Sequence, residues 1–271
     1  MKHVVSDIDL MQPQVMAIIN VTPDSFYSHS RAFSVEALER RVAEAIAEGA
    51  TIFDVGGYSS RLGADDLPLE EEWRRVELGA SVVRNMTNLP LSIDTFRSDV
   101  AERATERFGE VIINDISAGE ADARMIDVAA ANNLPYVAMH MRGTPQTMHS
   151  LTTYPRGVVT EVAEYLQRRA DYLASRGVER VVLDPGFGFA KSVEQNYELL
   201  SNLHRLTSLG LPLLVGLSRK SMVYKFLGTT PEESLSATSV LNFEALRRGA
   251  TILRVHDVKQ AVEVVKLYNI L

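Results

Sequence analysis

The sequence predicts an α/β protein that folds as a (β/α)8 TIM barrel, with residues 1–271 forming a single domain. Eight short apolar runs rich in β-branched residues recur along the chain, and each leads through a polar or glycine-rich turn into a segment with helical periodicity. The length suits such a barrel, since about 250 residues commonly form one. An open doubly wound sheet is the other arrangement of eight alternations, but no glycine-rich dinucleotide fingerprint follows the first run.

The predicted strands are short and almost wholly apolar, as expected for parallel strands that are buried on both faces. In chain order they are Met16–Ile19, Thr51–Val55, Leu91–Ile93, Val111–Ile113, Tyr136–Met139, Val181–Leu183, Leu213–Val215 and Ile252–Val255.

The segments between the strands carry recognisable helix ends. Ser34 is placed as the N-cap of a helix that ends before Gly49, and Pro68 opens the next helix. The signals in the later helices are two capping boxes, Ser192 with Gln195 and Thr230 with Glu233, and two C-terminal glycines, Gly177 and Gly249.

Composition narrows the class of protein. The chain is 46% hydrophobic and 23% charged, with a formal charge of −7, so it lacks the basic balance of a general nucleic-acid binder. It contains no cysteine, which excludes disulfides, thiolate zinc sites and cysteine nucleophiles.

The longest apolar run, at residues 211–217, is far shorter than a membrane span, which needs about 20 residues. Residues 1–9 lack the apolar run of a signal peptide. We expect a soluble cytoplasmic protein with no nucleic-acid or membrane partner.

A polar or ionisable residue ends, or directly follows, every predicted strand. These residues are Asn20, Asp54, Asp94, Asn114, Asp115, His140, Asp184, Ser218, Arg219, Lys220, Arg254, His256 and Asp257. Singly they have ordinary explanations: Asp115 satisfies backbone groups, for example, and His140 is a packed core histidine. As a set they indicate an active site, because the carboxyl ends of barrel strands converge on one mouth.

The residue types divide into two kinds of binding group. Asp94, Asn114 and Asp184 suit a flat heterocycle with N–H and amino groups, and Lys220 suits its carbonyl or nitrogen acceptors. Asn20 offers the hard oxygen that Mg²⁺ prefers beside water and phosphate oxygens. The groups suited to phosphate or pyrophosphate are Ser60, Arg61, Arg254 and His256.

An ordered set of motifs along the chain resembles the dihydropteroate synthases, the pterin-binding barrel enzymes of folate biosynthesis. The set covers all eight predicted strands, and its order is far more specific than any single motif. The motifs are INVTPDSF at 19–26, GGYSSRLGA at 56–64, SIDT at 92–95, IINDIS at 112–117, MHMRGTPQTM at 139–148, LDPGFGFAKS at 183–192, GLSRKS at 216–221 and RVHDV at 254–258.

The resemblance implies a reaction and a division of the site. The amine of p-aminobenzoate attacks the methylene carbon of 6-hydroxymethyl-7,8-dihydropterin pyrophosphate, and 7,8-dihydropteroate and pyrophosphate form. The implied catalytic residues are Asp94, Asp184, Lys220, Arg254 and His256. The implied pterin residues are Asp94, Asn114, Asp184 and Lys220. Met139 is a candidate for the lining of the pterin pocket, and packing in the core is the alternative for a methionine. The implied pyrophosphate residues are Asn20, Arg61, Arg254 and His256, with the cofactor Mg²⁺ at Asn20, and the hydroxyl of Ser60 is a further candidate by its chemistry. The implied p-aminobenzoate residues are Phe26, Phe189, Lys220 and Ser221.

The resemblance also implies a homodimer and inhibition by sulfonamides. Leu241, Phe243 and Leu246 are the residues we expect in a dimer face. The chain departs from the family pattern at residues 27–31, which lack the usual acidic residue, at Leu62, where proline is usual, and at Ala190, where glycine is usual. A bulkier second loop at Leu62 is one hypothesis for weaker sulfonamide binding, and neutral drift is the other.

Three other functions remain as alternatives. A methyltetrahydrofolate-binding methyltransferase barrel shares the pterin floor but has no need of Arg254 and His256 for pyrophosphate. An aldolase barrel would use Lys220 as a Schiff-base amine, which needs an apolar pocket to lower its pKa. A catalytically weakened paralogue would bind the pterin without turnover, and the altered first loop is its only support.

Overall fold

Eight parallel strands form a barrel at the centre of the computed structural model, which describes residues 3–21, 31–58 and 67–271. The strand order β8-β7-β6-β5-β4-β3-β10-β9 is that of a barrel, and a parallel bridge between Leu183 and Leu213 joins its two ends. The strands are β3 (Gln14–Asn20), β4 (Ile52–Gly56), β5 (Leu91–Asp94), β6 (Ile112–Asp115), β7 (Tyr136–Met139), β8 (Val181–Asp184), β9 (Leu214–Val215) and β10 (Ile252–Val255). The predicted (β/α)8 barrel is confirmed.

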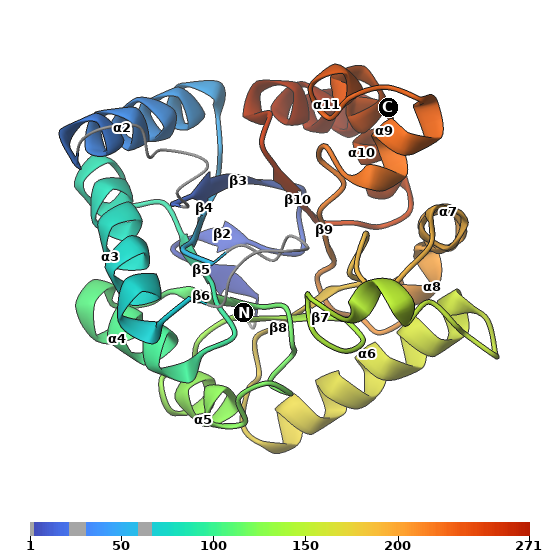
Figure 1. The fold of residues 1–271 in the computed structure, drawn as a ribbon, viewed down its shortest axis with the longest axis horizontal. Helices are drawn as coiled ribbons and strands as arrows, with labels where there is room; N and C mark the ends of the chain where they lie inside the picture. The colour runs from blue at the N-terminus through green and yellow to red at the C-terminus, as the bar shows by residue number, and fades with distance from the viewer. Residues whose placement is uncertain (1–2, 22–30, 59–66) are drawn as a thin grey trace.

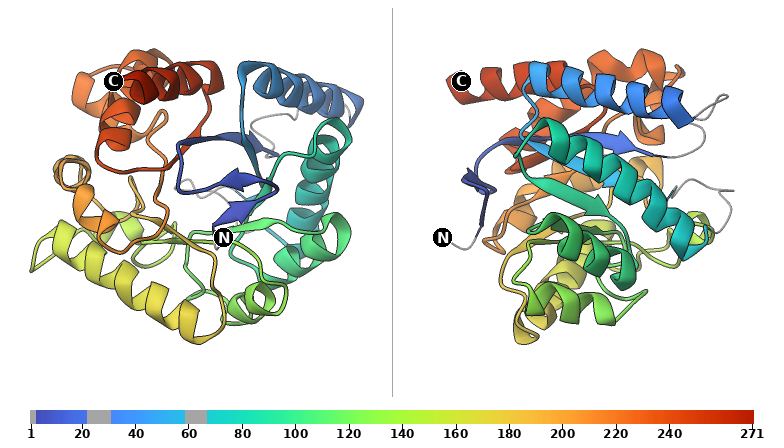
Figure 2. Two further views of the ribbon diagram at one scale, coloured as in Figure 1. Left: turned by 180° about the vertical axis from the view of Figure 1, so that it is seen from behind. Right: turned by 90° about the vertical axis from the view of Figure 1, so that its left-hand side faces the viewer.

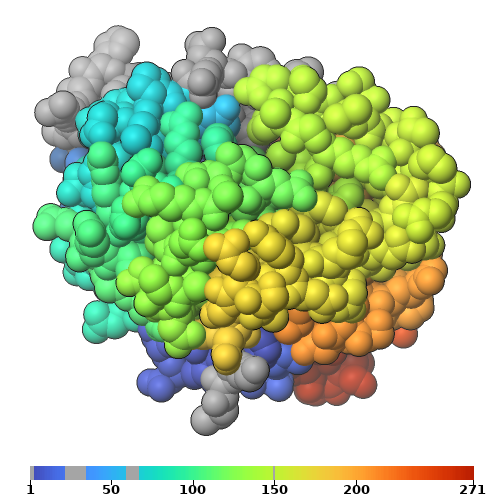
Figure 3. All heavy atoms as spheres, turned by 90° about the horizontal axis from the view of Figure 1, so that it is seen from below, coloured from blue at the N-terminus to red at the C-terminus, as the bar shows by residue number. Residues whose placement is uncertain are grey.

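Helices surround the strands as a ring (Figure 1), and on the face formed by α4 to α6 they hide the strands from solvent (Figure 3). The helices of the described residues are α2 (Arg31–Glu48), α3 (Leu69–Met86), α4 (Ser98–Phe108), α5 (Arg124–Ala131), α6 (Val158–Ser175), α7 (Val193–Ser201), α8 (His204–Thr207), α9 (Ser221–Leu227), α10 (Leu235–Arg247) and α11 (Val258–Ile270). Two 3-10 turns, η1 (Met148–Ser150) and η2 (Glu232–Ser234), complete them. No helix among these described residues is long and apolar enough to cross a membrane.

Most of the predicted helix ends are confirmed. Ser192 and Gln195 form the capping box of α7. Thr230 and Glu233 exchange the same pair of bonds, but they open η2, which leads into α10. The placement of Ser34 as an N-cap is wrong, because α2 already includes residues 31–34.

Alternation along the strands creates two apolar layers, because successive side chains point to opposite faces. Outward-facing residues pack against the helices in the larger core cluster. The inward-facing residues near the strand starts fill the barrel with a second cluster, which is Met16, Ile52, Ile112, Val137, Val182, Leu214 and Ile252 together with Val5 and Leu10.

A short N-terminal hairpin closes the lower end of the barrel. Its strands, β1 (Val4–Val5) and β2 (Ile8–Asp9), pair antiparallel and have no counterpart among the predicted strands. Figure 2 shows the hairpin lying across the barrel end that faces away from the viewer of Figure 1. Its apolar residues, Val5 and Leu10, belong to the inner cluster, so the hairpin is the floor of the barrel.

If the hairpin closes the barrel, only its buried side should contribute to the stability of the protein. Replacing Leu10, which is 1% exposed, with alanine leaves a cavity in the inner cluster and should lower the free energy of unfolding by about 3 kcal/mol. Met11→Ala is the matched control, because Met11 is 40% exposed and its truncation should cost no more than about 0.5 kcal/mol. Urea unfolding measures both. Equal losses in the two variants would show that the hairpin does not plug the barrel.

Candidate active site

The inward-facing positions change from apolar to polar on going up the barrel. Two residues beyond the inner apolar cluster, the same strand face carries Asp54 after Ile52, Asn114 after Ile112, Asp184 after Val182 and Arg254 after Ile252. Since residues i and i+2 of a strand share a face, these groups stand directly above the apolar floor. The carboxyl ends of the strands therefore form a polar mouth, as the sequence predicts.

A buried ionic network occupies this mouth. Arg254 donates from Nε to Asp54 and from Nη2 to Asp94, both at 2.6 Å. Asn114 Nδ2 lies 3.1 and 3.3 Å from the two carboxylate oxygens of Asp54. The structure thus brings together Asp94, Asn114 and Arg254, which the sequence placed at the site. Burying one of these charges alone would be costly, so the network depends on all its members.

Asp54 is the functional residue that the sequence analysis missed. It is fully buried, yet it contacts both Arg254 and Asn114, so it is the link between the predicted site residues. It was noted as polar at a strand end but given no role. Its spacing of two residues from Ile52, the same spacing that links Asn114 to Ile112, was the available signal.

Burial and neighbouring charge govern the protonation of Asp94. Burial raises the pKa of Asp94 to about 7, the charge of Arg254 lowers it, and the nearby carboxylate of Asp54 raises it further. Asp94 is therefore partly protonated near neutral pH in the ligand-free site. A ligand that brings N–H donors would favour its carboxylate form.

Asp184 and Lys220 lie across the mouth, joined by the loop that follows β8. The Gly186 N–H donates to Asp184 Oδ1 at 2.7 Å, and Lys220 Nζ donates to the Phe187 carbonyl oxygen. Lys220 Nζ also lies 4.9 Å from the centre of the Phe189 ring. Burial lowers the pKa of Lys220 to about 8, an effect that the charge of Asp184 opposes. These contacts place Asp184, Phe189 and Lys220 on one wall of the site.

Ala190 stands in this loop where the family pattern has glycine. Its φ of +51° is in the left-handed region, which costs a residue with a Cβ about 1 kcal/mol. The substitution therefore leaves local backbone strain but changes no side chain of the mouth.

His256 is held by Ser218 at the end of β10. The Ser218 hydroxyl accepts the His256 backbone N–H at 3.2 Å and lies 3.1 Å from His256 Nδ1. These two contacts with one hydroxyl fix the orientation of the imidazole ring. Burial lowers the pKa of His256 to about 4, helped by the charge of Arg254, so the ring is a neutral donor at pH 7. His256 makes no hydrogen bond to Arg254 among the described contacts.

The remaining predicted residues divide between the mouth and the undescribed loops. Met139 is buried and pairs in register with Asp184, and Asn20 pairs with Gly56 at the end of β3. Ser221 is the first residue of α9. Phe26, Ser60, Arg61 and Leu62 lie outside the described residues, as do residues 27–30 of the altered first loop.

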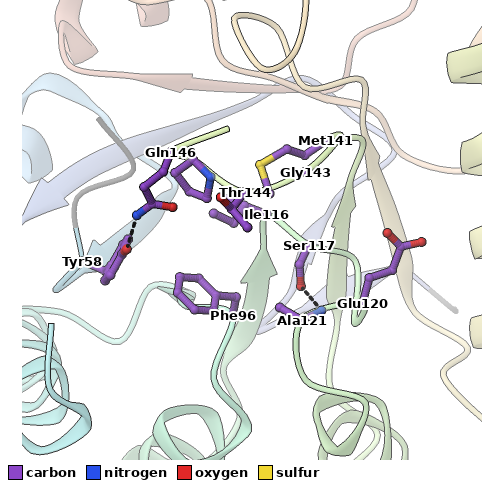
Figure 4. Close-up of a pocket in the computed structure, with 11 residues that line it drawn as sticks. Tyr58, Phe96, Ile116, Ser117, Glu120, Ala121, Met141, Gly143, Thr144 and Gln146 are labelled. Carbon is purple, nitrogen blue, oxygen red and sulfur yellow. Dashed lines mark hydrogen bonds between the residues drawn. The ribbon is translucent and has the colours of Figure 1, made fainter. Parts of the chain in front are cut away.

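An aromatic cavity of about 750 Å³ adjoins the mouth, lined by loops that follow β4 to β7. Tyr58 and Phe96 meet edge to face with ring centres 5.1 Å apart, and Gln146 donates to the Tyr58 hydroxyl at 3.3 Å (Figure 4). Ile116 and Met141 line the same cavity, and each lies two residues beyond an inward-facing residue, Asn114 and Met139. None of these lining residues was predicted as a site residue.

The two ordinary explanations given for single residues hold. Asp115 faces away from the mouth, where its carboxylate accepts bonds from the backbone of Ser117 and Gly119 and from the Tyr136 hydroxyl. His140 is buried, and burial lowers its pKa to about 2. Among the described residues, no group of three or more His, Asp or Glu side chains is arranged to hold a metal ion.

Comparison with known proteins gives the family. A family model described as "Pterin binding enzyme" matches residues 16–256. The dihydropteroate synthase of Haemophilus influenzae is 38% identical over 264 residues, which cover 97% of this chain and 95% of the relative. Two solved structures of the Xanthomonas albilineans dihydropteroate synthase cover 97% of this chain. The one with 4-aminobenzoic acid is 38% identical, with a TM-score of 0.88 over 94% of its chain. The one with 7,8-dihydropteroate is 36% identical, with a TM-score of 0.86 over 95% of its chain. The chain therefore belongs to the dihydropteroate synthases within the pterin-binding enzymes.

Proposed function

We propose that the chain condenses p-aminobenzoate with 6-hydroxymethyl-7,8-dihydropterin pyrophosphate, and that the described mouth is where it does so. The observation that carries this assignment is Arg254, which bonds at once the buried carboxylate of Asp54 and the partly exposed carboxylate of Asp94. A guanidinium held in this way stands between a carboxylate pocket suited to a pterin and the open end of the barrel, where a pyrophosphate would lie.

Pterin binding proceeds by exchange of hydrogen-bond partners. The N–H groups of the pterin take the Asp94 carboxylate that Arg254 occupies in the ligand-free site, while Asp54 keeps its bond to Arg254 Nε. The freed Nη2 then turns toward the pyrophosphate. Asn114 and Asp184 hold the other edges of the ring, and Met139 packs against it.

Departure of pyrophosphate is helped by groups aimed at its developing charge. Arg254 supplies a positive charge, and His256 supplies the N–H of a neutral imidazole. Mg²⁺ would supply further charge neutralisation, held by the side-chain oxygen of Asn20. One amide ligand beside water and phosphate oxygens fits the habit of Mg²⁺, which seldom needs a protein cage.

The ring of p-aminobenzoate lies against Phe189 and Lys220, with its carboxylate near Ser221. Its amine attacks the methylene carbon, the bond from that carbon to the pyrophosphate oxygen breaks, and the amine loses a proton. The carboxylates of Asp94 and Asp184 favour the cation that develops on the pterin methylene. No step needs a nucleophilic side chain, so Lys220 forms no Schiff base.

We also propose that the chain acts as a homodimer through α10 and α11. Val240, Leu267 and Ile270 are exposed apolar residues of these helices. The expected dimer face is corrected at Leu246, which is fully buried on the inner side of α10. Leu241 and Phe243 are partly buried at the flanks of the helix and stay predicted interface residues. The cytoplasmic location, sulfonamide inhibition and the effect of Leu62 stay predictions.

The function is tested by pyrophosphate release from purified protein given the pterin pyrophosphate and Mg²⁺. Release should depend on p-aminobenzoate and should fall at least about 100-fold in Arg254→Ala and in Asp184→Ala, which each remove a group from the mouth. Arg107→Ala is the matched control, because Arg107 is 61% exposed on α4, and it should retain wild-type rates. Tight pterin binding without release by the wild type would favour the weakened paralogue.

Substitution of Asp54 should lower the activity, although Asp54 does not contact the substrate in the proposed mechanism. In Asp54→Asn the guanidinium of Arg254 loses the fully buried one of its two carboxylate partners and keeps only Asp94, so its orientation is no longer fixed when a ligand takes Asp94. We expect kcat/KM for the pterin pyrophosphate to fall about 100-fold or more. Asp127→Asn, at an exposed ion pair on α5, serves as the control. A normal kcat/KM in Asp54→Asn would remove Asp54 from the account.

The pKa values of Asp94 and Lys220 predict a bell-shaped pH profile. Asp94 is a carboxylate only above about pH 7, and Lys220 is an ammonium only below about pH 8, so kcat/KM should fall on both sides of this window. In Lys220→Arg the guanidinium stays protonated to far higher pH, so the alkaline limb of the profile should disappear. The acid limb should remain, and the maximum value of kcat/KM should be lower than in the wild type. An alkaline limb that is unchanged in Lys220→Arg would assign that limb to another group.

A further inference from the structure

Lys191 is a buried amine for which the proposed mechanism has no use. It stands between the loop after β8 and α7, and the residue is only 9% exposed. Burial lowers the pKa of Lys191 well below its usual value. Its Nζ donates to the carbonyl oxygens of Gly186 at 2.9 Å and Phe189 at 3.0 Å, and it lies 3.0 Å from His140 Nδ1. The amine thus has three hydrogen-bond partners, two of which are backbone carbonyl oxygens of one turn.

These contacts make Lys191 the centre of a turn. The Phe189 N–H bonds back to the Gly186 carbonyl at 3.1 Å, so residues 186–189 curl around the Lys191 amine. The Gly188 N–H is fixed from outside by Asn196 at 2.7 Å. Ala190 is held in the left-handed region beside the amine, and Tyr154 bonds its carbonyl at 3.0 Å. The loop conformation is therefore imposed by contacts on both sides.

The outer side of the same turn belongs to the active site. The Phe187 carbonyl accepts the bond from Lys220 Nζ, and the Phe189 ring lies 4.9 Å from that amine. Gly188 has a φ of +81°, and a Cβ there would lie 3.2 Å from Lys220 Cδ. The backbone of the turn thus lies between two lysine side chains: Lys191 bonds its inner side and Lys220 bonds its outer side.

His140 ties the turn to the barrel. Its backbone N–H donates to the Asp184 carbonyl at 2.9 Å, and its ring meets Tyr165 edge to face with ring centres 4.9 Å apart. A Cβ on Gly186 would lie 2.0 Å from the His140 carbonyl oxygen, so the turn packs directly on the end of β7. Lys191 therefore fixes the turn relative to a barrel strand and not only relative to itself.

We propose that Lys191 is a positioning residue for the p-aminobenzoate half of the site, acting through the turn that presents Phe189 and holds Lys220. On the pterin side, Asp184 accepts the Gly186 N–H of this turn at 2.7 Å, but Asp94, Asn114 and Arg254 make no described contact with it. Three groups for the pterin and pyrophosphate are thus independent of the turn, whereas Phe189 and Lys220 both depend on it. Loss of the Lys191 amine should therefore weaken the use of p-aminobenzoate more than the binding of the pterin. The inference rests on the proposed function of the mouth.

The test is a split between the two substrates in Lys191→Met, which keeps the length of the side chain and removes its donors. We expect KM for p-aminobenzoate to rise at least about 10-fold, kcat at saturation to fall less than about threefold, and Kd for the pterin pyrophosphate to stay within about threefold. Arg107→Met, at an exposed cation of α4, is the matched control and should change none of these values. A kcat that falls with both substrate constants unchanged would make Lys191 merely structural and overturn the proposal.

A double-mutant cycle with Phe189→Ala gives a readout that a general folding defect would not move. If Lys191 acts through Phe189, adding Lys191→Met to Phe189→Ala should raise KM for p-aminobenzoate by less than about twofold more. Fully multiplied effects would contradict the proposal.

If Lys191→Met fails to fold, His140→Phe is the second test, since it removes one hydrogen-bond partner of Lys191 and keeps a ring against Tyr165. A rise of about threefold in KM for p-aminobenzoate supports the proposal, and an unchanged KM overturns it. Wild-type activity is measured in the same assay. Absence of p-aminobenzoate-dependent release in the wild type would reject the proposed function, whereas normal constants in active variants would reject the role of Lys191 alone.

Discussion

The shared guanidinium of Arg254 is the interaction on which the mouth of the barrel depends. It joins Asp54, a fully buried carboxylate, to Asp94, whose side chain is partly open to the mouth. Three carboxylates, Asp54, Asp94 and Asp184, there face two cations, Arg254 and Lys220, so the described mouth has no excess positive charge of its own. In the proposed mechanism these pairs rearrange when the anionic substrate binds: a ligand that satisfies Asp94 frees Arg254 Nη2 for the anion.

The barrel makes this arrangement possible by dividing its interior. Below the mouth, the inward-facing side chains are apolar and the N-terminal hairpin seals them from solvent. The ionic network therefore rests on a dry floor, where its hydrogen bonds are strong and its charges cannot be solvated from beneath. The same burial raises the pKa of Asp94 and lowers that of Lys220, so both pKa values lie near neutral pH. The fold thus affects the chemistry of the site through the apolar layer, which excludes solvent from below the polar residues.

Much of this account could be predicted from the sequence because the signals are local. The apolar runs predict the eight barrel strands, and the polar residues that follow these runs predict the side chains at the mouth of the barrel. The N-terminal hairpin was missed because each of its strands spans only two residues, too few for a periodic pattern. Leu246 was misplaced because an apolar residue on a helix fits a core or an interface equally well. Asp54 was left without a role because its partners, Asn114 and Arg254, are 60 and 200 residues away in the chain.

In the proposed mechanism Asp54 holds Arg254 throughout, whereas Asp94 holds it only until the pterin binds. A crystal structure with bound 6-hydroxymethyl-7,8-dihydropterin pyrophosphate would test this difference. In that complex we expect the bond between Arg254 Nε and Asp54 to persist, Asp94 to bond the pterin, and Arg254 Nη2 to bond the pyrophosphate. A pterin bound away from Asp94, with both carboxylates still holding Arg254, would contradict it.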